Sequence, residues 1–435
     1  MTMKFINFPQ LDIKIEGMED ILLPRMMKIR QIYDDYRIKN ITGWIREQMG
    51  KNLSHKELYK GKRLCITAGS RGILHLDTII RAIVDKLKEW DAEPFIIPAM
   101  GSHGGATAEG QRTLLADYNI TEESMGVPIH ASMDVVSIGE LKDGTPVYCD
   151  KIAYESDGII VLNKVKPHTD FHGKHESGIA KMMAIGIANH KGASMFHMQG
   201  FQSFPERIPQ VCNVFLEKAP VAFGVGIVEN AYDEISDIEI MEKETILEKD
   251  AELLCIAKGK IAKFKFPSID VLIIDEIGKN ISGNGHDPNI TGRSNSEGFE
   301  DALDLKKLFI RSLNKETHHN ACGLGVADVT TRRCLRSVDF ETTWANVITS
   351  TMLRGGAIPM YLENDREALL VAIRTCTGID LNQAKVVRIK DTRHMDCIEV
   401  SENYYEELEE HPEVEILSEP YEIQFDAEGF LRPLF

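Results

Sequence analysis

Residues 63–100 read RLCITAGSRGILHLDTIIRAIVDKLKEWDAEPFIIPAM, and this stretch decides the fold class. The apolar run RLCITA (63–68) predicts a buried strand, and residues 76–90 repeat apolar side chains at helical spacing. EPFIIPAM (93–100) predicts a second strand. Strand, helix and strand in this order form a βαβ unit, in which the two strands run parallel.

Two further apolar runs extend the predicted sheet, GIIVLNKV (158–165) and VAFGVGIVEN (221–230). Short apolar strands that alternate with helical stretches are typical of α/β proteins with a mostly parallel sheet flanked by helices. Ligands of such sheets collect beyond the carboxyl ends of the strands. The loops that follow these runs are therefore where we expect the chemistry.

The length of 435 residues favours two domains. A boundary is expected where the helical stretch DAELLCIAKGKIAK passes through FKFPS into a new strand, SIDVLIIDEIG (268–278). We predict an N-terminal α/β catalytic domain of residues 1–266, to which residues 415–435 return. A C-terminal α/β domain of residues 267–414 closes on it, with the active site in the cleft between them.

The second domain has weaker patterns than the first. We expect a helix over 300–318, a strand in GLGVADVT (323–330), and helices in TTWANVITSTML (342–353) and DREALLVAIRTC (365–376).

Composition excludes several classes of protein. The 67 acidic and 50 basic side chains leave a net charge of −17, which argues against nucleic acid as a partner. The N-terminus lacks the unbroken apolar segment of a secretory signal, and no apolar run approaches the roughly 18 residues of a membrane span. Eight cysteines without a CxxC pair fit reduced thiols. We expect a soluble cytoplasmic protein that does not bind membranes.

Two glycine-rich loops follow the strands of the βαβ unit, AGSRG (68–72) and MGSHGGAT (100–107). Glycine lets backbone N–H groups approach an anion, but a tight turn needs glycine even when nothing binds. Arg71 and His103 are more informative than the glycines, because each lies in the turn itself, where it has no helix face to cover.

The segment from Asn163 to His197 holds five of the fourteen histidines. Clustered imidazoles suit a metal site or acid–base chemistry near neutral pH, although a solvated polar loop fits the local pattern equally well. Lys181 lies in the apolar run GIAKMMAIGIA, where desolvation would lower the pKa of its amine and favour a nucleophile or a covalent anchor. The alternative is a lysine that extends its charged end to water.

The order of these features resembles the nickel-dependent lactate racemase family of 2-hydroxyacid racemases and epimerases. It comprises an arginine turn, GSH, KPH, the glycine-bounded lysine of SGIAKMMAIG and a histidine sixteen residues later, within residues 63–200. The resemblance implies a nickel-pincer nucleotide covalently bound to Lys181, with His197 as the nickel ligand and His103 and His168 as paired acid–base residues. It also implies cofactor contacts from Ser70, Arg71 and Gly101, and substrate contacts from Arg71, Lys279 and Asn280.

The sequence departs from the family pattern at three places. Ala68 and Gly72 stand where the family commonly has an aspartate three residues before the arginine and a proline after it. The loop between His168 and Lys181 is about three residues longer, and it contains His172, Lys174, His175 and Glu176. The segment EIGKNISGNGHDPNITGR (276–293) is far more polar than the methyl group of lactate requires. This polarity indicates a polyhydroxy or dicarboxylic substrate, although an exposed hinge would have the same composition.

Three functions fit these observations. The first is an isomerase that inverts C2 of a 2-hydroxyacid, with the enzymes of cofactor synthesis as partners and a homo-oligomer left open. The second keeps the fold but holds another metal, such as zinc or iron, with some of the five histidines between 168 and 197, for hydrolysis or dehydration. The third is a carboxylate-binding protein without catalysis, which predicts no covalent modification of Lys181.

Overall fold

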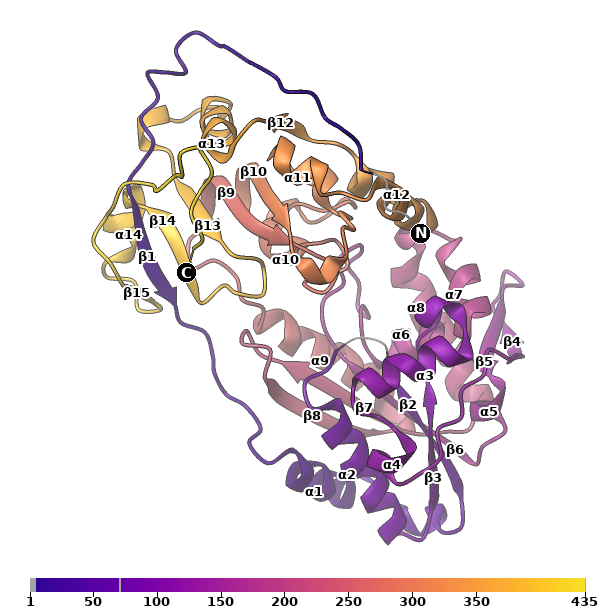
Figure 1. Cartoon of the computed structure of the whole chain (residues 1–435). Coiled ribbons are helices and arrows are strands. Elements are labelled where there is room, and N and C mark those ends of the chain that lie inside the picture. The colour runs from indigo at the N-terminus through magenta and orange to yellow at the C-terminus, as the bar shows by residue number, and fades with distance from the viewer. Residues whose placement is uncertain (1–4, 70–71, 435) are drawn as a thin grey trace. The chain divides into compact units, whose positions relative to one another are not determined.

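A computed structural model describes residues 5–69 and 72–434, which form two compact units. We call residues 35–260 the N-terminal unit, and residues 5–34 together with 261–434 the C-terminal unit. Both are α/β structures with sheets flanked by helices, which confirms the predicted fold class (Figure 1). Within the described residues, every helix is too short or too polar to cross a lipid bilayer.

The N-terminal unit is built on a five-stranded sheet in the order β3-β2-β6-β7-β8. The first four strands in this order are parallel, and β8 is antiparallel to β7. The four predicted strands of this unit are confirmed. The strands of the sheet are β2 (Arg63–Ala68), β3 (Glu93–Pro98), β6 (Gly158–Lys164), β7 (Val221–Glu229) and β8 (Ile235–Glu242), and a separate hairpin pairs β4 (Val135–Glu140) with β5 (Pro146–Asp150).

Helices of the N-terminal unit pack on both faces of its sheet, over two buried apolar clusters. The side chain of Ile160 on β6 points into one cluster and that of Val161 into the other, as the alternation of a strand requires. The helices are α1 (Ile41–Asn52), α2 (Leu76–Glu89), α3 (Ala108–Asp117), α4 (Glu122–Met125), α5 (Lys151–Tyr154), α6 (Ile179–Lys181), α7 (Asn189–His197), α8 (Phe204–Lys218) and α9 (Ile246–Gly259).

The C-terminal unit contains an eight-stranded mixed sheet in the order β12-β11-β10-β9-β13-β14-β1-β15. The first five strands in this order are parallel and the last three pair antiparallel. The strands are β1 (Met26–Gln31), β9 (Ser268–Ile277), β10 (Asp304–Leu313), β11 (Val329–Thr331), β12 (Met360–Leu362), β13 (Val386–Ile389), β14 (Cys397–Ser401) and β15 (Val414–Ile416). The helices are α10 (Pro288–Thr291), α11 (Arg332–Arg336), α12 (Phe340–Thr349), α13 (Asp365–Arg374) and α14 (Tyr405–Leu408).

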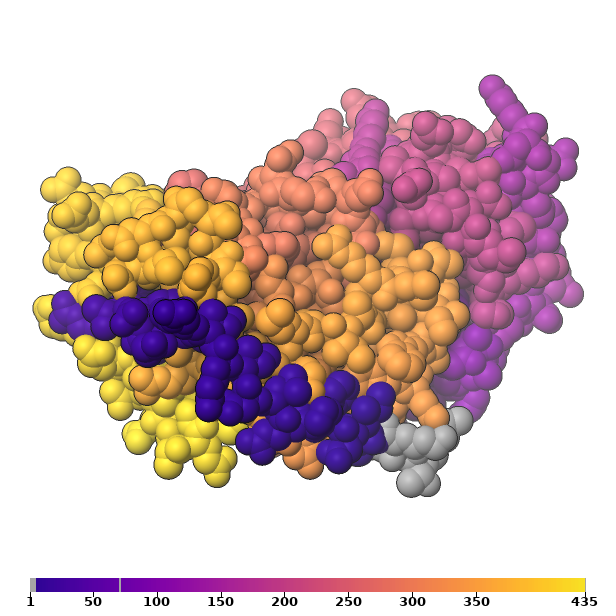
Figure 2. Space-filling view, turned by 90° about the horizontal axis from the view of Figure 1, so that it is seen from above, coloured from indigo at the N-terminus to yellow at the C-terminus, as the bar shows by residue number. Residues whose placement is uncertain are grey.

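The two ends of the chain lie in a different unit from the one expected. The main boundary falls at residue 260, six residues before the predicted one, but β1 pairs with β14 and β15 and so draws residues 5–34 into the C-terminal unit. Residues 415–434 also belong to this unit, because Tyr421 exchanges backbone hydrogen bonds with Met26. In Figure 2 the N-terminal segment, in indigo, runs over the surface of this unit.

The predicted helix over 300–318 is wrong, because residues 304–313 form strand β10. This strand pairs in parallel with β9 along most of its length and with β11 on its other side. Leu308, Phe309 and Ile310 are consecutive and fully buried. A run buried on both faces has no alternation, so periodicity could not distinguish it from a buried helix.

Candidate active site

The loop between β6 and α6 carries His168, and a buried carboxylate holds it in shape. Lys166 and Ser177 close the loop through two backbone hydrogen bonds. Inside it, Glu176 is 1% exposed and accepts the backbone N–H groups of His168 at 2.7 Å and Gly173 at 3.1 Å. Its carboxylate also pairs with Lys258 of α9 at 2.6 Å. Glu176 is therefore a structural anchor for the main chain of His168.

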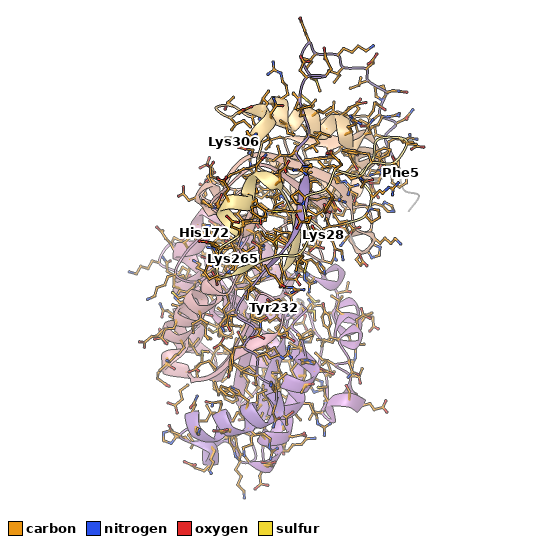
Figure 3. The ribbon with its side chains drawn as sticks, turned by 90° about the vertical axis from the view of Figure 1, so that its left-hand side faces the viewer. Phe5, Lys28, His172, Tyr232, Lys265 and Lys306 are labelled. Carbon is orange, nitrogen blue, oxygen red and sulfur yellow. The ribbon has the colours of Figure 1, made fainter. Side chains whose placement is uncertain are left out.

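The same contacts change the pKa of Glu176. Burial alone would raise this pKa, but hydrogen bonds from His172, from Lys258 and from two backbone N–H groups outweigh burial and lower it. The carboxylate therefore stays ionised in the folded protein. His172 lies on the exposed side of the loop, 3.6 Å from Glu176 (Figure 3).

The imidazole of His168 is held by its neighbours in one orientation. Its Nδ1 accepts the backbone N–H of Asp170 at 3.0 Å, and the ring lies 4.4 Å from that of Phe171, centroid to centroid. A ring nitrogen that accepts a hydrogen bond carries no proton, so the neutral ring holds its proton on Nε2. The carboxylate of Asp170 lies 3.8 Å from the same Nδ1 and is nearly buried, with 12% of its side chain exposed.

The short helix α6 ends at Lys181. A carboxylate from another helix accepts a hydrogen bond from its first residue. Asp250 of α9 is 1% exposed, and it accepts the N–H of Ile179 at 2.6 Å and a hydrogen bond from Nδ1 of His175 at 2.9 Å. A Cβ on Gly178 would lie 2.2 Å from Oδ1 of Asp250, so only glycine lets this carboxylate approach. The close approach of Asp250 therefore explains why position 178 is a glycine.

Asp250→Ala is expected to destabilise the N-terminal unit, because it leaves two buried donors without an acceptor. We expect a loss of about 2–6 kcal/mol in the free energy of unfolding, at roughly 1–3 kcal/mol for each orphaned donor. Urea unfolding followed by circular dichroism measures this loss. Glu252→Ala is the matched control, since Glu252 lies on the same helix but is exposed and pairs with the exposed Lys249. Equal stability of the two variants would contradict the anchoring role of Asp250.

The chain widens into one π-helical turn directly after Lys181, over Met182–Gly186. The N–H of Ile187 donates to the carbonyl of Met182, five residues back, at 2.9 Å. Gly186 is needed here, since a Cβ would lie 2.2 Å from Sδ of Met182 and 2.9 Å from the carbonyl oxygen of Ala99. Such turns are frequent at functional sites, because they re-aim the side chains around them.

His197 ends α7 and lies among the aromatic rings that also contact His168. Its ring centroid is 5.6 Å from that of Phe201, and Phe201 is 5.7 Å from His168. Burial, and then the positive charge of Lys181, lower the pKa of His197 to about 4. The Nζ of Lys181 lies 5.9 Å from the centroid of Phe171. One aromatic cluster, Phe171, Phe201 and Phe204, therefore brings His168, Lys181 and His197 together.

The loop that carries His103 is fastened to the π-helical turn. The N–H of Gly101 donates to the carbonyl of Gly186 at 3.1 Å, and Gly101 has a φ of +56°, which favours glycine. The buried amide of Gln111 donates to the carbonyls of Gly101 at 3.0 Å and of His103 at 3.4 Å. The side chain of His103 is exposed. Ser70 and Arg71 lie outside the described residues.

Lys279 and Asn280 belong to the C-terminal unit, whereas the other site residues belong to the N-terminal unit. The amine of Lys279 donates to the side-chain oxygen of Asn346, and Asn280 accepts from Asn314 at 2.8 Å. Their predicted contact with substrate, and the predicted position of the active site between the domains, stay predictions.

The same polar segment contains His286, which is fully buried. Burial, and then the charge of Arg293, lower the pKa of His286 to about 4. Because the unfolded ring titrates near 6.5, the unfolded state binds more protons between pH 6.5 and 4, and stability falls as the pH falls through this range. We expect His286→Gln to lose less stability than the wild type between pH 7 and pH 5, by about 2 kcal/mol. Urea titrations at both pH values measure this difference, and parallel losses would contradict it.

The other histidines of the 168–197 segment have structural or surface roles. His175 is buried against Asp250, and His190 is exposed with Ser194 as its partner at 3.3 Å. Across residues 5–69 and 72–434, no three His, Cys, Asp or Glu side chains are grouped so that they could hold a metal ion by themselves.

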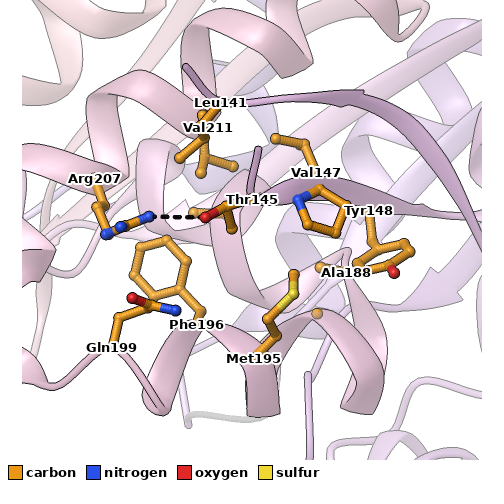
Figure 4. Close-up of a pocket in the computed structure, with 13 residues that line it drawn as sticks. Leu141, Thr145, Val147, Tyr148, Ala188, Met195, Phe196, Gln199, Arg207 and Val211 are labelled. Atoms are coloured by element: carbon orange, nitrogen blue, oxygen red, sulfur yellow. Dashed lines mark hydrogen bonds between the residues drawn. The ribbon is translucent and has the colours of Figure 1, made fainter. Parts of the chain in front are cut away.

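Two cavities lie in the described part of the chain, and Ala184 of the π-helical turn and Phe196 of α7 help to line the smaller one. One of about 20 Å³, room for about one water molecule, lies between the β4–β5 hairpin and α7, where Arg207 donates to Thr145 at 3.3 Å (Figure 4). Another of about 360 Å³ lies in the C-terminal unit, beside Arg388 and Glu399. The guanidinium of Arg388 is already bonded to Asp275 and Glu399.

Comparison with known proteins agrees with this α/β fold. Residues 20–207 match the family model of the lactate racemase N-terminal domain. Residues 20–207 therefore form a domain of the lactate racemase N-terminal type. No curated protein matches the chain.

Two solved structures are similar to the chain. The lactate racemase apoprotein from Thermoanaerobacterium thermosaccharolyticum aligns with a TM-score of 0.53 at 14% identity, over 84% of this chain and 99% of that chain. A protein from Thermotoga maritima aligns with a TM-score of 0.48 at 12% identity, over 82% of this chain and 97% of that chain. The first of these likenesses shows a shared fold.

Sequence reasoning missed four residues that position the site: Gln111, Asp170, Glu176 and Asp250. Glu176 and Asp170 had a signal, since acidic side chains beside a candidate histidine are common partners of its ring or backbone. No sequence signal pointed to Asp250, because it lies on a helix about seventy residues after the residues that it contacts, His175 and Ile179.

Proposed function

We propose that this protein inverts C2 of a 2-hydroxyacid as a racemase or epimerase, with a nickel-pincer nucleotide attached to Lys181. The family and the fold support a racemase-type function. The observation that carries the finer proposal is the gathering of Lys181, His197 and His168 around one aromatic cluster.

The side chains present fit this cofactor. Lys181 offers an amine for a covalent bond. His197, with its pKa lowered to about 4, is a neutral imidazole at neutral pH, and neutral imidazole is a ligand that nickel accepts. Gly101 places a backbone free of a side chain beside the π-helical turn. When bound, the group supplies a reversible hydride acceptor, which no side chain offers.

The protein must then move one proton at the hydroxyl of the substrate. His168 holds a proton on Nε2 while Nδ1 accepts from the N–H of Asp170, so the resting ring is a proton donor. To accept a proton at Nε2, the ring must keep its other proton on Nδ1, where the Asp170 carboxylate is the nearby acceptor. We therefore assign Asp170 as the positioning residue that supports both states of His168.

His103 is proposed as the second acid–base residue. Two enantiomers present their hydroxyl groups on different sides, so one group removes the proton and the other returns it. The side chain of His103 is exposed, and the hydrogen bonds of Gly101 and Gln111 fix the loop that carries it.

The test is metal analysis and peptide mass spectrometry of the full chain, produced in a host that makes the pincer nucleotide. We expect stoichiometric nickel and a mass adduct on the peptide that contains Lys181. Zinc or iron without an adduct would favour the other-metal enzyme, and neither metal nor adduct would favour the carboxylate-binding protein.

A further inference from the structure

The chain bends sharply between Lys181 and His197. Their positions differ by sixteen in the sequence, and as continuous helix this separation would span about 24 Å. Yet burial, and then the charge of Lys181, lower the pKa of His197, so the two side chains are neighbours. Both also lie against the aromatic cluster. The direction in which α7 leaves the bend therefore decides how far His197 lies from Lys181.

The bend ends at Asn189, the first residue of α7, whose backbone is in the left-handed region. Its φ is +50°, and the residue is fully buried. Residues with a Cβ are seldom found in this region, although asparagine tolerates it better than most. Such a conformation persists only where the surrounding structure holds it, and it is most common at functional sites. The contacts of Asn189 therefore fix the direction of α7.

Asp150, the last residue of β5, holds the bend on both sides of Ala188. Its backbone N–H donates to the carbonyl of Ile187 at 2.8 Å, and its Oδ2 accepts from Nδ2 of Asn189 at 2.8 Å. The amide of Asn189 also donates to the carbonyl of Ser132 at 3.1 Å. The other oxygen of Asp150 accepts two backbone N–H groups at the start of α5, so this buried carboxylate is itself held in one orientation.

The first turn of α7 packs directly on β5 (Figure 1). A Cβ on Gly192 would lie 2.3 Å from that of Ala188 and 3.5 Å from that of Tyr148 on β5. The first of these distances is shorter than side chains tolerate, so this turn of the helix is closely packed. The hairpin that ends in Asp150 therefore supports α7 by packing as well as by hydrogen bonds.

We propose that Asn189 and Asp150 are positioning residues that set the distance between His197 and Lys181. That these two side chains hold one cofactor rests on the proposed function, whereas the bend does not. A covalent bond to Lys181 does not depend on the direction of α7. A metal ligand must instead be held within about 0.5 Å of its productive position, so a small rotation of α7 would withdraw His197. The pair therefore controls the retention of nickel and not the attachment of the cofactor.

Asn189→Gly tests this assignment in the full chain, loaded in a host that makes the pincer nucleotide. Glycine adopts a positive φ without strain, so the backbone conformation stays accessible while the side-chain hydrogen bonds are lost. We expect the adduct on Lys181 to remain and nickel to pass to EDTA about tenfold faster than from the wild type. Asn119→Gly is the matched control, since Asn119 has a φ of +60°, is exposed and donates to Asp77 at 2.9 Å. It should release nickel at the wild-type rate.

Exchange of the two side chains separates lost geometry from a lost fold. Asn189→Asp alone places two buried carboxylates against each other and should also speed the release of nickel. Asp150→Asn added to it restores one donor opposite one acceptor, in the reverse order, and should slow the release again.

A crosslink reports the same distance in the chain without cofactor. In His197→Cys, a short reagent that joins an amine to a thiol should link position 197 to Lys181, and peptide mass spectrometry identifies the link. Because the yield depends steeply on the alignment of the two groups, we expect Asn189→Gly to reduce it by roughly tenfold. Asn119→Gly should leave the yield unchanged.

Nickel release at the wild-type rate from Asn189→Gly, or an unchanged yield of the link, would overturn the proposal. The proposed function fails in a different way. A chain that forms the link only when Asn189 is present, but acquires neither adduct nor nickel, would support the positioning role and contradict the proposed function. An adduct with nickel that every variant retains equally would do the reverse.

Discussion

Lys181→Ala is expected to reduce racemisation to the uncatalysed background and to abolish both the adduct and stoichiometric nickel. The amine of Lys181 is the proposed point of covalent attachment, and the cofactor supplies chemistry that no side chain replaces. Activity is measured by polarimetry on the loaded protein, and nickel by elemental analysis of the same sample.

Lys191→Ala is the matched control. Lys191 lies ten residues further on, is exposed, and places its amine 4.6 Å from the ring of Tyr148. It should keep the adduct, the nickel and the activity. An adduct that persists in Lys181→Ala, or appears on Lys191, would place the cofactor elsewhere and contradict the assignment.

His168→Gln is expected to keep the cofactor but lower turnover by roughly 10²–10⁴-fold, the usual contribution of a positioned acid–base group. Glutamine keeps a polar side chain beside Phe171, but it cannot carry a proton between substrate and solvent. The value of kcat/KM should fall equally in both directions, since the equilibrium between the enantiomers does not change. His103→Gln is expected to behave in the same way.

Two controls separate chemistry from structure. His190→Gln should leave turnover unchanged, because His190 is exposed on α7 and its hydrogen bond to Ser194 lies within that helix. Nickel content should equal that of the wild type in all three histidine variants. Wild-type turnover in both His168→Gln and His103→Gln would overturn the acid–base assignment, whereas loss of nickel from either would show a structural effect instead.

The sequence by itself determined the fold class and most of the N-terminal unit. The runs at 63–68, 93–100, 158–165 and 221–230 all form strands, because short apolar runs between helical stretches are typical of a buried parallel sheet. The resemblance also placed Lys181, His168 and His197 in one site, and the aromatic cluster brings these three together.

Only the tertiary structure decided which unit the chain ends join, where β10 lies and which carboxylates hold the site. The pairing of β1 with β14 spans nearly the whole chain, and the bond between Asp250 and His175 spans about seventy residues. Local periodicity carries no information about such contacts, because it reports which face of an element is buried and not what buries it. The burial of polar side chains in residues 278–296 is of the same kind, since a polar composition does not distinguish an exposed hinge from a buried loop.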